Sequence, residues 1–222
     1  MRTLGIAVIA AACAACIPPV QWMPAEPTFT APNAGYAVEL PAGWMRLADA
    51  SKPDELLLTR DGRNVGRILV ASDEIGHKFI VGDSKRVLAT SMSPQEAAEA
   101  VIDGLESDKD WTSVKVLENA PAMLAGRKGF RIVATYKEDG LRMGIVIHGV
   151  VIPTGVFYVI YQAPERVYFQ RHLPIYEKLV ASFQLRPDAK GMKWKHPEEE
   201  EKDEEKNDEQ KMPDVPPPSA FR

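Results

Sequence analysis

Histidine, cysteine and serine are the side chains of this sequence that could carry catalysis or bind a metal. The four histidines, His77, His148, His172 and His196, are far apart, and no two have the spacing that places metal ligands on one turn of a helix. The sequence has no Gly-x-Ser-x-Gly or Ser-x-x-Lys motif and no glycine-rich phosphate-binding loop. We therefore expect a protein that is not an enzyme and that needs no cofactor or metal.

Each histidine in the body of the chain has a structural interpretation. His148 lies in an apolar run, which predicts a satisfied or half-exposed histidine of a β-sheet. His172 falls on a C-terminal segment with helical periodicity, where we expect it at the surface. His77 belongs to a long loop at residues 73–92 that also contains Asp73, Glu74 and Asp83. A weak divalent-metal site is an alternative there, but scattered polar residues are usual in loops.

Aromatic side chains are frequent between residues 157 and 183, and core packing explains most of them. The alternative is a groove between the last strand and the last helix. The residues that would line this groove or lie near it are Tyr158, Tyr161, Arg166, Tyr168 and Arg171. If the domain binds a ligand or a partner, this is where the sequence predicts the site.

Both cysteines, Cys13 and Cys16, lie at the N-terminus, so the rest of the chain has no disulfide framework or cysteine metal site. Arg2 and the apolar run that follows are typical of a signal peptide over residues 1–15. The run is too short to span a bilayer, which needs about 20 residues. Small residues precede each cysteine, and this pattern resembles the bacterial lipobox, in which the cysteine becomes the lipidated first residue of the mature protein.

We favour Cys16 as the lipidated residue because it leaves the longer apolar run, and Cys13 is the alternative. The position three residues before each cysteine lacks the usual Leu or Val, so an ordinary secretory signal is a further alternative. Acyl chains such as palmitate would anchor the protein to a membrane of the cell envelope. Neither cysteine is followed by Asp, and by resemblance to Gram-negative lipoproteins this favours the outer membrane.

Charge is concentrated at the C-terminus. The chain carries a net charge of −4, yet residues 198–222 contain ten acidic and four basic residues, so the rest is close to neutral. No basic surface for nucleic acid is indicated. Residues 187–222 have little to bury, which predicts a disordered acidic and Pro-rich tail. A docking arm for a basic partner is a second interpretation of this tail.

The remaining chain predicts a proline-rich tether at residues 16–34 and one domain at residues 35–186. A helix should begin at Ser93, which with Glu96 forms a capping box. A second helix is predicted up to Phe183, with Pro174 near its start. Strands are expected at residues 36–40, 44–47, 55–60, 67–72, 114–117, 130–136, 141–152 and 156–161.

Several of these segments together resemble PsbP-like domains. They are Tyr36–Leu40 with the following Pro-Ala-Gly-Trp, Gly126–Arg131, Asp139–Arg142 and Tyr176–Phe183. The resemblance covers residues 34–186 and implies an α+β fold, a single antiparallel sheet flanked by helices. It also implies a role in binding or assembly, and it offers no catalytic residues.

We therefore expect a non-enzymatic envelope lipoprotein that binds or helps to assemble a protein partner. A small-ligand carrier, or a hydrolase that uses the aromatic groove, is the alternative. The two classes differ in cavity shape, since a concave pocket with a buried acid or base of shifted pKa would favour the alternative.

Overall fold

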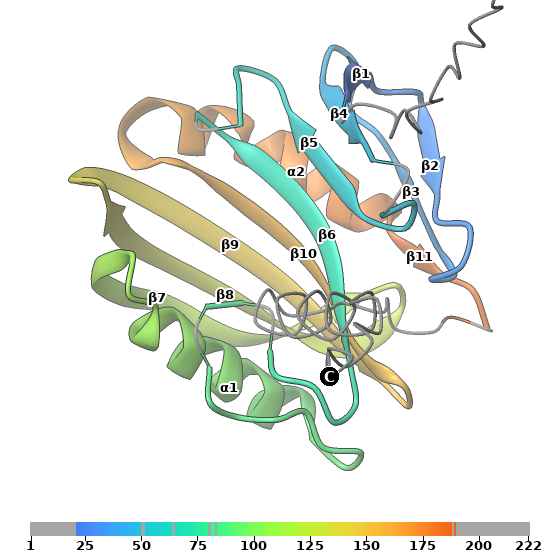
Figure 1. Cartoon of the computed structure of the whole chain (residues 1–222), viewed down its shortest axis with the longest axis vertical. Helices are drawn as coiled ribbons and strands as arrows, with labels where there is room; N and C mark the ends of the chain where they lie inside the picture. The colour runs from blue at the N-terminus through green and yellow to red at the C-terminus, as the bar shows by residue number, and fades with distance from the viewer. Residues whose placement is uncertain are drawn as a thin grey trace, which may run out of the picture.

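The computed structural model describes residues 21–49, 52–63, 65–79, 81–82, 84–187 and 189. Within these residues, eight strands form one antiparallel sheet in the order β1-β4-β5-β6-β10-β9-β8-β7 (Figure 1). Their bounds are β1 Gln21–Pro24, β4 Met45–Ala48, β5 Leu56–Thr59, β6 Arg67–Glu74, β7 Trp111–Leu124, β8 Arg127–Glu138, β9 Leu141–Ile152 and β10 Gly155–Pro164. A second sheet has the order β11-β3-β2, with β2 Thr28–Thr30, β3 Tyr36–Glu39 and β11 Gln184–Leu185.

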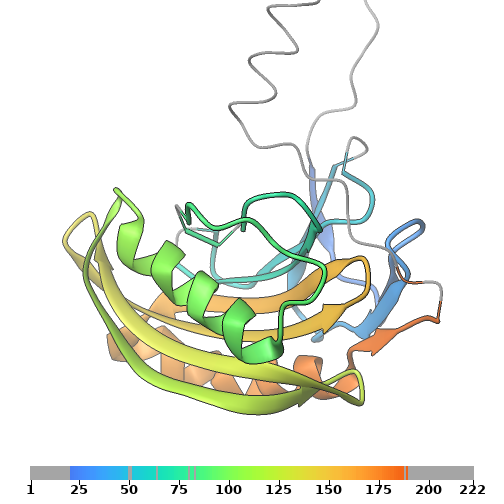
Figure 2. The ribbon, with the colours of Figure 1, turned by 90° about the horizontal axis from the view of Figure 1, so that it is seen from below.

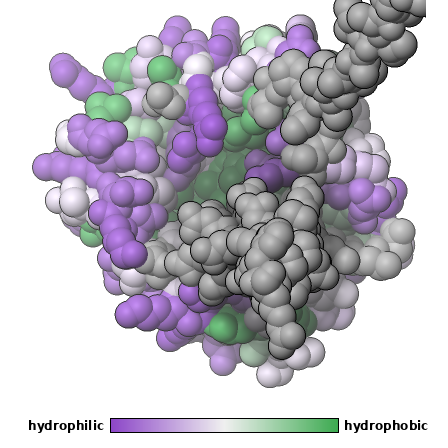
Figure 3. Space-filling model, viewed as in Figure 1, coloured by the Kyte–Doolittle hydropathy of each residue, from purple (hydrophilic) through white to green (hydrophobic). Residues whose placement is uncertain are grey.

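One helix covers each face of the large sheet (Figure 2). Helix α1 spans Pro94–Ser107 and helix α2 spans Gln170–Ser182. The α+β architecture, an antiparallel sheet flanked by helices, is confirmed. The small three-stranded sheet was not predicted, because the sequence pattern of its strands does not distinguish them from the strands of the large sheet. Figure 3 shows the face that carries α1, on which polar side chains surround a hollow with apolar side chains.

Helix α1 begins where the sequence predicted. The Ser93 hydroxyl accepts a hydrogen bond from the Glu96 amide at 3.2 Å, and the Glu96 carboxylate accepts one from the Ser93 amide at 2.7 Å. These two bonds satisfy amides that the first helical turn leaves without partners. The apolar face of α1 is buried against the sheet through Ala97, Ala98, Val101 and Leu105.

Two hydrophobic clusters hold the layers together, one on each face of the sheet. Because successive side chains of a strand point to opposite faces, Phe157 packs on the α2 side and Tyr158 on the α1 side. Strands β9 and β10 are covered on both faces, which explains their continuous apolar sequences. Helix α2 contributes Tyr176 and Leu179 to the cluster on its own side.

Helix α2 differs from the prediction at its start. It begins at Gln170, directly after the π-helical turn η1 at Glu165–Phe169, and Pro174 lies inside it rather than near its first turn. The Tyr161 hydroxyl lies 2.9 Å from the Tyr168 carbonyl oxygen and 3.2 Å from that of Phe169. A partner from the sheet therefore compensates the interrupted helical hydrogen bonding at this junction.

The predicted tether is wrong for residues 21–34, which belong to the fold. Strand β1 pairs with β4 and β2 pairs with β3, and the Phe29 side chain is buried in the cluster on the α2 side. Pro24 ends an edge strand and Pro27 lies between strands, so neither has to donate a hydrogen bond within a sheet. Residues 16–20 of the tether and the signal peptide at residues 1–15 lie outside the described residues.

The C-terminal end of the domain extends slightly past its predicted boundary. The Arg186 amide donates to the Gly35 carbonyl at 2.8 Å, and Ala189 packs against the cluster on the α2 side. The rest of the acidic tail lies outside the described residues. Among the helices that the structure describes, none has the length and apolar character needed to cross a membrane.

Candidate functional site

The five residues of the predicted aromatic groove do not come together in the structure. Tyr158 is fully buried on the α1 side of the sheet, whereas Tyr161 is fully buried on the α2 side. Tyr168 is half-buried near Tyr161, while Arg166 and Arg171 are exposed. Tyr158 and Tyr161 are three positions apart on one strand, and an odd spacing places two side chains on opposite faces of a sheet.

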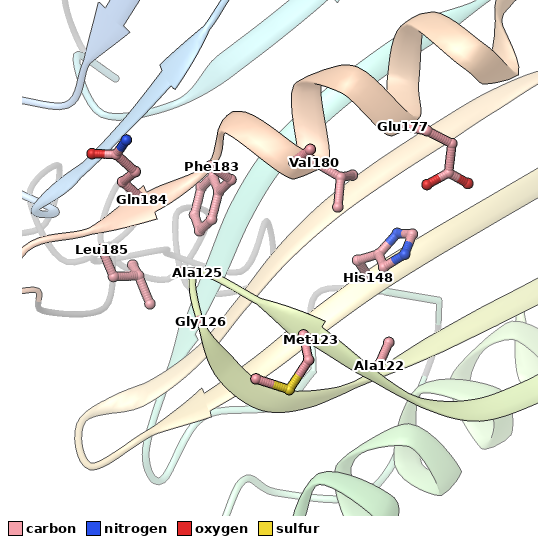
Figure 4. Close-up of a pocket in the computed structure, with 11 residues that line it drawn as sticks. Ala122, Met123, Ala125, Gly126, His148, Glu177, Val180, Phe183, Gln184 and Leu185 are labelled. Carbon is pink, nitrogen blue, oxygen red and sulfur yellow. The ribbon is translucent and has the colours of Figure 1, made fainter.

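A different groove lies between the β7–β8 hairpin and the C-terminal end of α2, with a volume of about 720 Å³ (Figure 4). Val180, Phe183 and Leu185 from the region of α2 and β11 contribute apolar side chains to its lining, and Gln184 contributes a polar one. Met123 of the hairpin also lines the groove. Small residues also line it, at Ala122, Ala125, Gly126 and Ala181. The groove is open to solvent, and one of its ends carries polar side chains, those of His148 and Glu177.

The hairpin wall owes its shape to a two-residue turn. Ala125 and Gly126 have φ values of 52° and 70°, the left-handed pair that joins twisted strands tightly. Leu124 and Arg127 form the pair next to the turn, and Pro121 with Phe130 is the fourth pair from it. In a hairpin with a two-residue turn, hydrogen-bonded and non-hydrogen-bonded pairs alternate outward from the turn, so the backbone N and carbonyl of Pro121 point away from β8. The N–H that proline lacks is therefore not needed for a hydrogen bond between β7 and β8. Pro121 also hinders the addition of another strand at this edge of the sheet.

His148 is held by a hydrogen bond to helix α2. It lies opposite Arg131 of β8 and Val159 of β10, and its Nδ1 is 2.7 Å from the Tyr176 hydroxyl. That hydroxyl donates its only hydrogen to the Val159 carbonyl at 2.9 Å. We therefore assign the imidazole hydrogen to Nδ1, which donates to Tyr176, and this leaves Nε2 as an acceptor.

The environment keeps His148 neutral. Burial, followed by the positive charge of Arg131, lowers the pKa of His148 from 6.5 to about 4, while Glu118 opposes this shift. Burial raises the pKa of Tyr176 well above its ordinary value. At neutral pH the pair is an uncharged imidazole bonded to an uncharged phenol.

Arg131 connects two glutamates beside this pair. Its guanidinium pairs with Glu118 of β7 through a short contact and with Glu177 of α2 at 3.3 Å. Burial lowers the pKa of Arg131, but its hydrogen bonds and attraction to the two carboxylates outweigh burial and raise that pKa overall. No local motif marks Arg131 or Glu177 in the sequence, because strand pairing and helix docking bring these two residues together over 46 positions.

The partners of His148 limit the chemistry that this site shows. The hydrogen-bond partner of His148 is a tyrosine, so the structure shows no serine or cysteine nucleophile activated by this histidine. Within the part of the chain that the structure describes, no three His, Cys, Asp or Glu side chains are placed to hold a metal ion. The groove offers a mixed surface, with apolar side chains beside the hydrogen-bond acceptors of His148 and Glu177.

The expected surface position of His172 is wrong. Its side chain is buried, and its Nε2 lies 3.5 Å from a carboxylate oxygen of Asp61. Its ring meets that of Trp44 edge to face at a centroid distance of 5.4 Å. Burial lowers the pKa of His172, and the charge of Asp61 opposes the shift. His77 is exposed in the loop between β6 and α1, and Asp83 from the same predicted loop lies outside the described residues.

Comparison with known proteins finds similarity in structure but not in sequence family. No protein-family model and no curated protein matches the chain. The fold is similar to that of LpqN from Mycobacterium tuberculosis, with a TM-score of 0.51 and 15% identity over 76% of this chain and 92% of LpqN. At this identity the likeness concerns the fold alone.

Two further solved structures are less similar. A Bacteroides thetaiotaomicron protein has a TM-score of 0.41 at 11% identity, and the match covers 72% of this chain and 48% of that one. The cyanobacterial PsbP protein CyanoP of Synechocystis has a TM-score of 0.42 at 10% identity, covering 77% of this chain and 96% of that one.

Proposed function

We propose that the protein is a non-enzymatic lipoprotein of the cell envelope whose domain binds a segment of a protein partner. The observation that carries the proposal is the groove between the β7–β8 hairpin and α2. It is open to solvent and combines the apolar side chains of Val180, Phe183 and Leu185 with the polar side chains of His148 and Glu177 at one end. Apolar anchors beside a few polar contacts are the usual make-up of a protein-binding surface.

The envelope assignment has two supports of different kinds. LpqN, which the fold resembles, is described as involved in cell envelope biogenesis in Mycobacterium tuberculosis. The sequence independently has a signal-like N-terminus with Cys16 at a lipobox-like position. A lipid at this cysteine would hold the domain at a membrane surface, where a protein partner could be reached.

A small-ligand carrier is the second candidate, and His148 is the observation that favours it. A buried histidine with a lowered pKa at the end of a groove is one mark of a small-molecule site. The openness of this groove favours a chain segment, because pockets for small molecules usually enclose most of their ligand.

The groove can be tested by closing it. Ala181 is an exposed alanine of α2 that lines the groove, and a tryptophan there would occupy the space without disturbing the core. In a crosslinking experiment on membranes, the full-length wild-type chain should capture a protein partner. We expect the Ala181→Trp variant not to capture this partner. The matched control is Ala89→Trp, an exposed alanine of the loop between β6 and α1. If Ala181→Trp captures the same partner in the same amount, the groove is not the binding surface.

The anchor has its own test. Cys16→Ala should abolish labelling by a palmitate analogue and release the protein from the membrane fraction. If Cys13→Ala has this effect and Cys16→Ala does not, Cys13 is the lipidated residue. Labelling that survives both substitutions would disprove the lipoprotein assignment.

A further inference from the structure

We propose that the polar end of the groove recognises a lysine or arginine side chain of an extended partner segment. This inference rests on the proposed function, since it names the chemistry of the segment that the groove would bind. It is drawn from the charges and the hydrogen-bonding groups that His148, Arg131, Glu118 and Glu177 present together.

The charges at the polar end of the groove favour a basic ligand. Among the residues that the structure describes, the two carboxylates of Glu118 and Glu177 pair with one guanidinium, that of Arg131, so this cluster carries a net negative charge. The Glu177 side chain is 41% exposed and lines the groove, whereas the Arg131 side chain is only 23% exposed. A ligand entering the groove therefore meets the carboxylate more readily than the guanidinium. An acidic ligand would be repelled there, and a basic one attracted.

The hydrogen-bonding groups at the polar end of the groove favour the same kind of ligand. His148 is 5% exposed and lines the groove. Its Nδ1 is bonded to Tyr176, and its Nε2 has no hydrogen-bond partner among the described residues. Both groups at this end of the groove are therefore acceptors, one neutral and one charged. Lysine and arginine side chains carry several donors and no acceptor, which is the complement of this arrangement.

Apolar side chains next to the polar end fit the rest of such a side chain. Val180 lies between the polar end and Phe183, along the same side of the groove (Figure 4). The aliphatic stem of a lysine or arginine can lie on an apolar surface while its charged end meets acceptors. An apolar residue two positions away in the extended segment would be about 7 Å further on, towards Phe183 and Leu185.

The test uses the ¹⁵N-labelled chain and short blocked peptides at neutral pH. The peptide acetyl-Ala-Lys-Ala-Leu-Ala-amide should shift the amide resonances of His148, Glu177 and Phe183. The same peptide with norleucine in place of lysine should bind about twofold to fivefold more weakly, the effect of one partly exposed charged contact. Long-range ¹H–¹⁵N spectra should show that Nε2 of His148 is unprotonated.

Glu177→Gln should weaken the lysine peptide by a similar factor. Glu165→Gln is the matched control, because Glu165 also pairs with an arginine, Arg142 at 3.1 Å, and is similarly exposed at 38%, yet it does not line the groove. Glu177→Lys should reverse the preference, so that a glutamate peptide binds better than the lysine peptide. Spermidine alone should shift these resonances far less than the peptide, because it has no apolar side chain for the walls.

The failure of this inference can be told apart from that of the proposed function. If lysine and norleucine peptides bind equally, or neither shifts a groove resonance, recognition of a basic side chain is disproved. The crosslinking experiment with Ala181→Trp then tests separately whether the groove binds a protein partner. If spermidine reproduces the peptide shifts, the ligand is a free polyamine rather than an extended segment of a protein partner.

Discussion

Replacing His148 by asparagine should make the stability of the domain less dependent on pH. In the folded protein burial and Arg131 lower the pKa of His148 to about 4, whereas an unfolded chain restores a value near 6.5. Between these values the unfolded state binds a proton that the folded state does not. The free energy of unfolding must therefore decrease as the pH falls from about 6.5 to about 4, and this effect is absent above about pH 7.

The size of the effect follows from the same pKa values. Between about pH 7 and pH 4.5, protonation of the unfolded state at this one site should remove about 2–3 kcal/mol of stability. Asparagine at position 148 keeps a donor near the place of Nδ1, so the bond to the Tyr176 hydroxyl can survive. It does not titrate, so His148→Asn should lose that much less stability than the wild type over this range.

Urea unfolding of the lipid-free chain, followed by tryptophan fluorescence at several pH values, measures this difference. The comparison between variant and wild type is needed because burial also lowers the pKa of His172. His77→Asn, at an exposed loop position, is the control and should follow the wild type. If His148→Asn loses as much stability as the wild type, the folded protein admits the protonated imidazole and the reasoning on His148 is refuted.

Three other predictions concern packing, capping and the chain end. A Cβ on Gly149 would lie 2.2 Å from the ring of the neighbouring strand's phenylalanine, so Gly149→Ala should cost about 1–3 kcal/mol in urea unfolding. Gly66→Ala, whose Cβ would meet only an ordinary contact at 3.5 Å, should change stability by less than about 0.5 kcal/mol. Ser93→Ala removes a helix cap and should cost about 1 kcal/mol, and an unchanged urea midpoint would contradict the role of the capping box. Removing residues 190–222 should leave the melting temperature unchanged, because these residues have few large apolar side chains. A clear decrease would show that part of the tail packs on the domain.

The features predicted correctly from the sequence depend on residues close together in the chain. The capping box of α1 joins positions only three apart, and Asp139–Gly140 form a tight turn with φ values of 50° and 79°. Alternation along β8 and the apolar runs of β9 and β10 gave their strand identity directly. Such signals do not depend on the rest of the fold.

The features that were missed depend on contacts between distant segments. Prolines at residues 24 and 27 indicate a tether when taken alone, and only pairing with β4 and β3 shows that they border strands. Helical periodicity alone predicts His172 at the surface, whereas Trp44, far away in the sequence, packs against its ring. The sequence predicts Tyr158 and Tyr161 in one groove, whereas the sheet separates them onto opposite faces.

The sequence by itself determined the α+β class, the start of α1 and the identity of the central strands, because capping, turn geometry and side-chain alternation act locally. Only the tertiary structure decided where a binding groove could form. Strand register placed Arg131 beside His148, and the docking of α2 brought Tyr176 and Glu177 to them. No local pattern encodes these neighbours, because register and helix docking are settled by how the two faces of the sheet are packed.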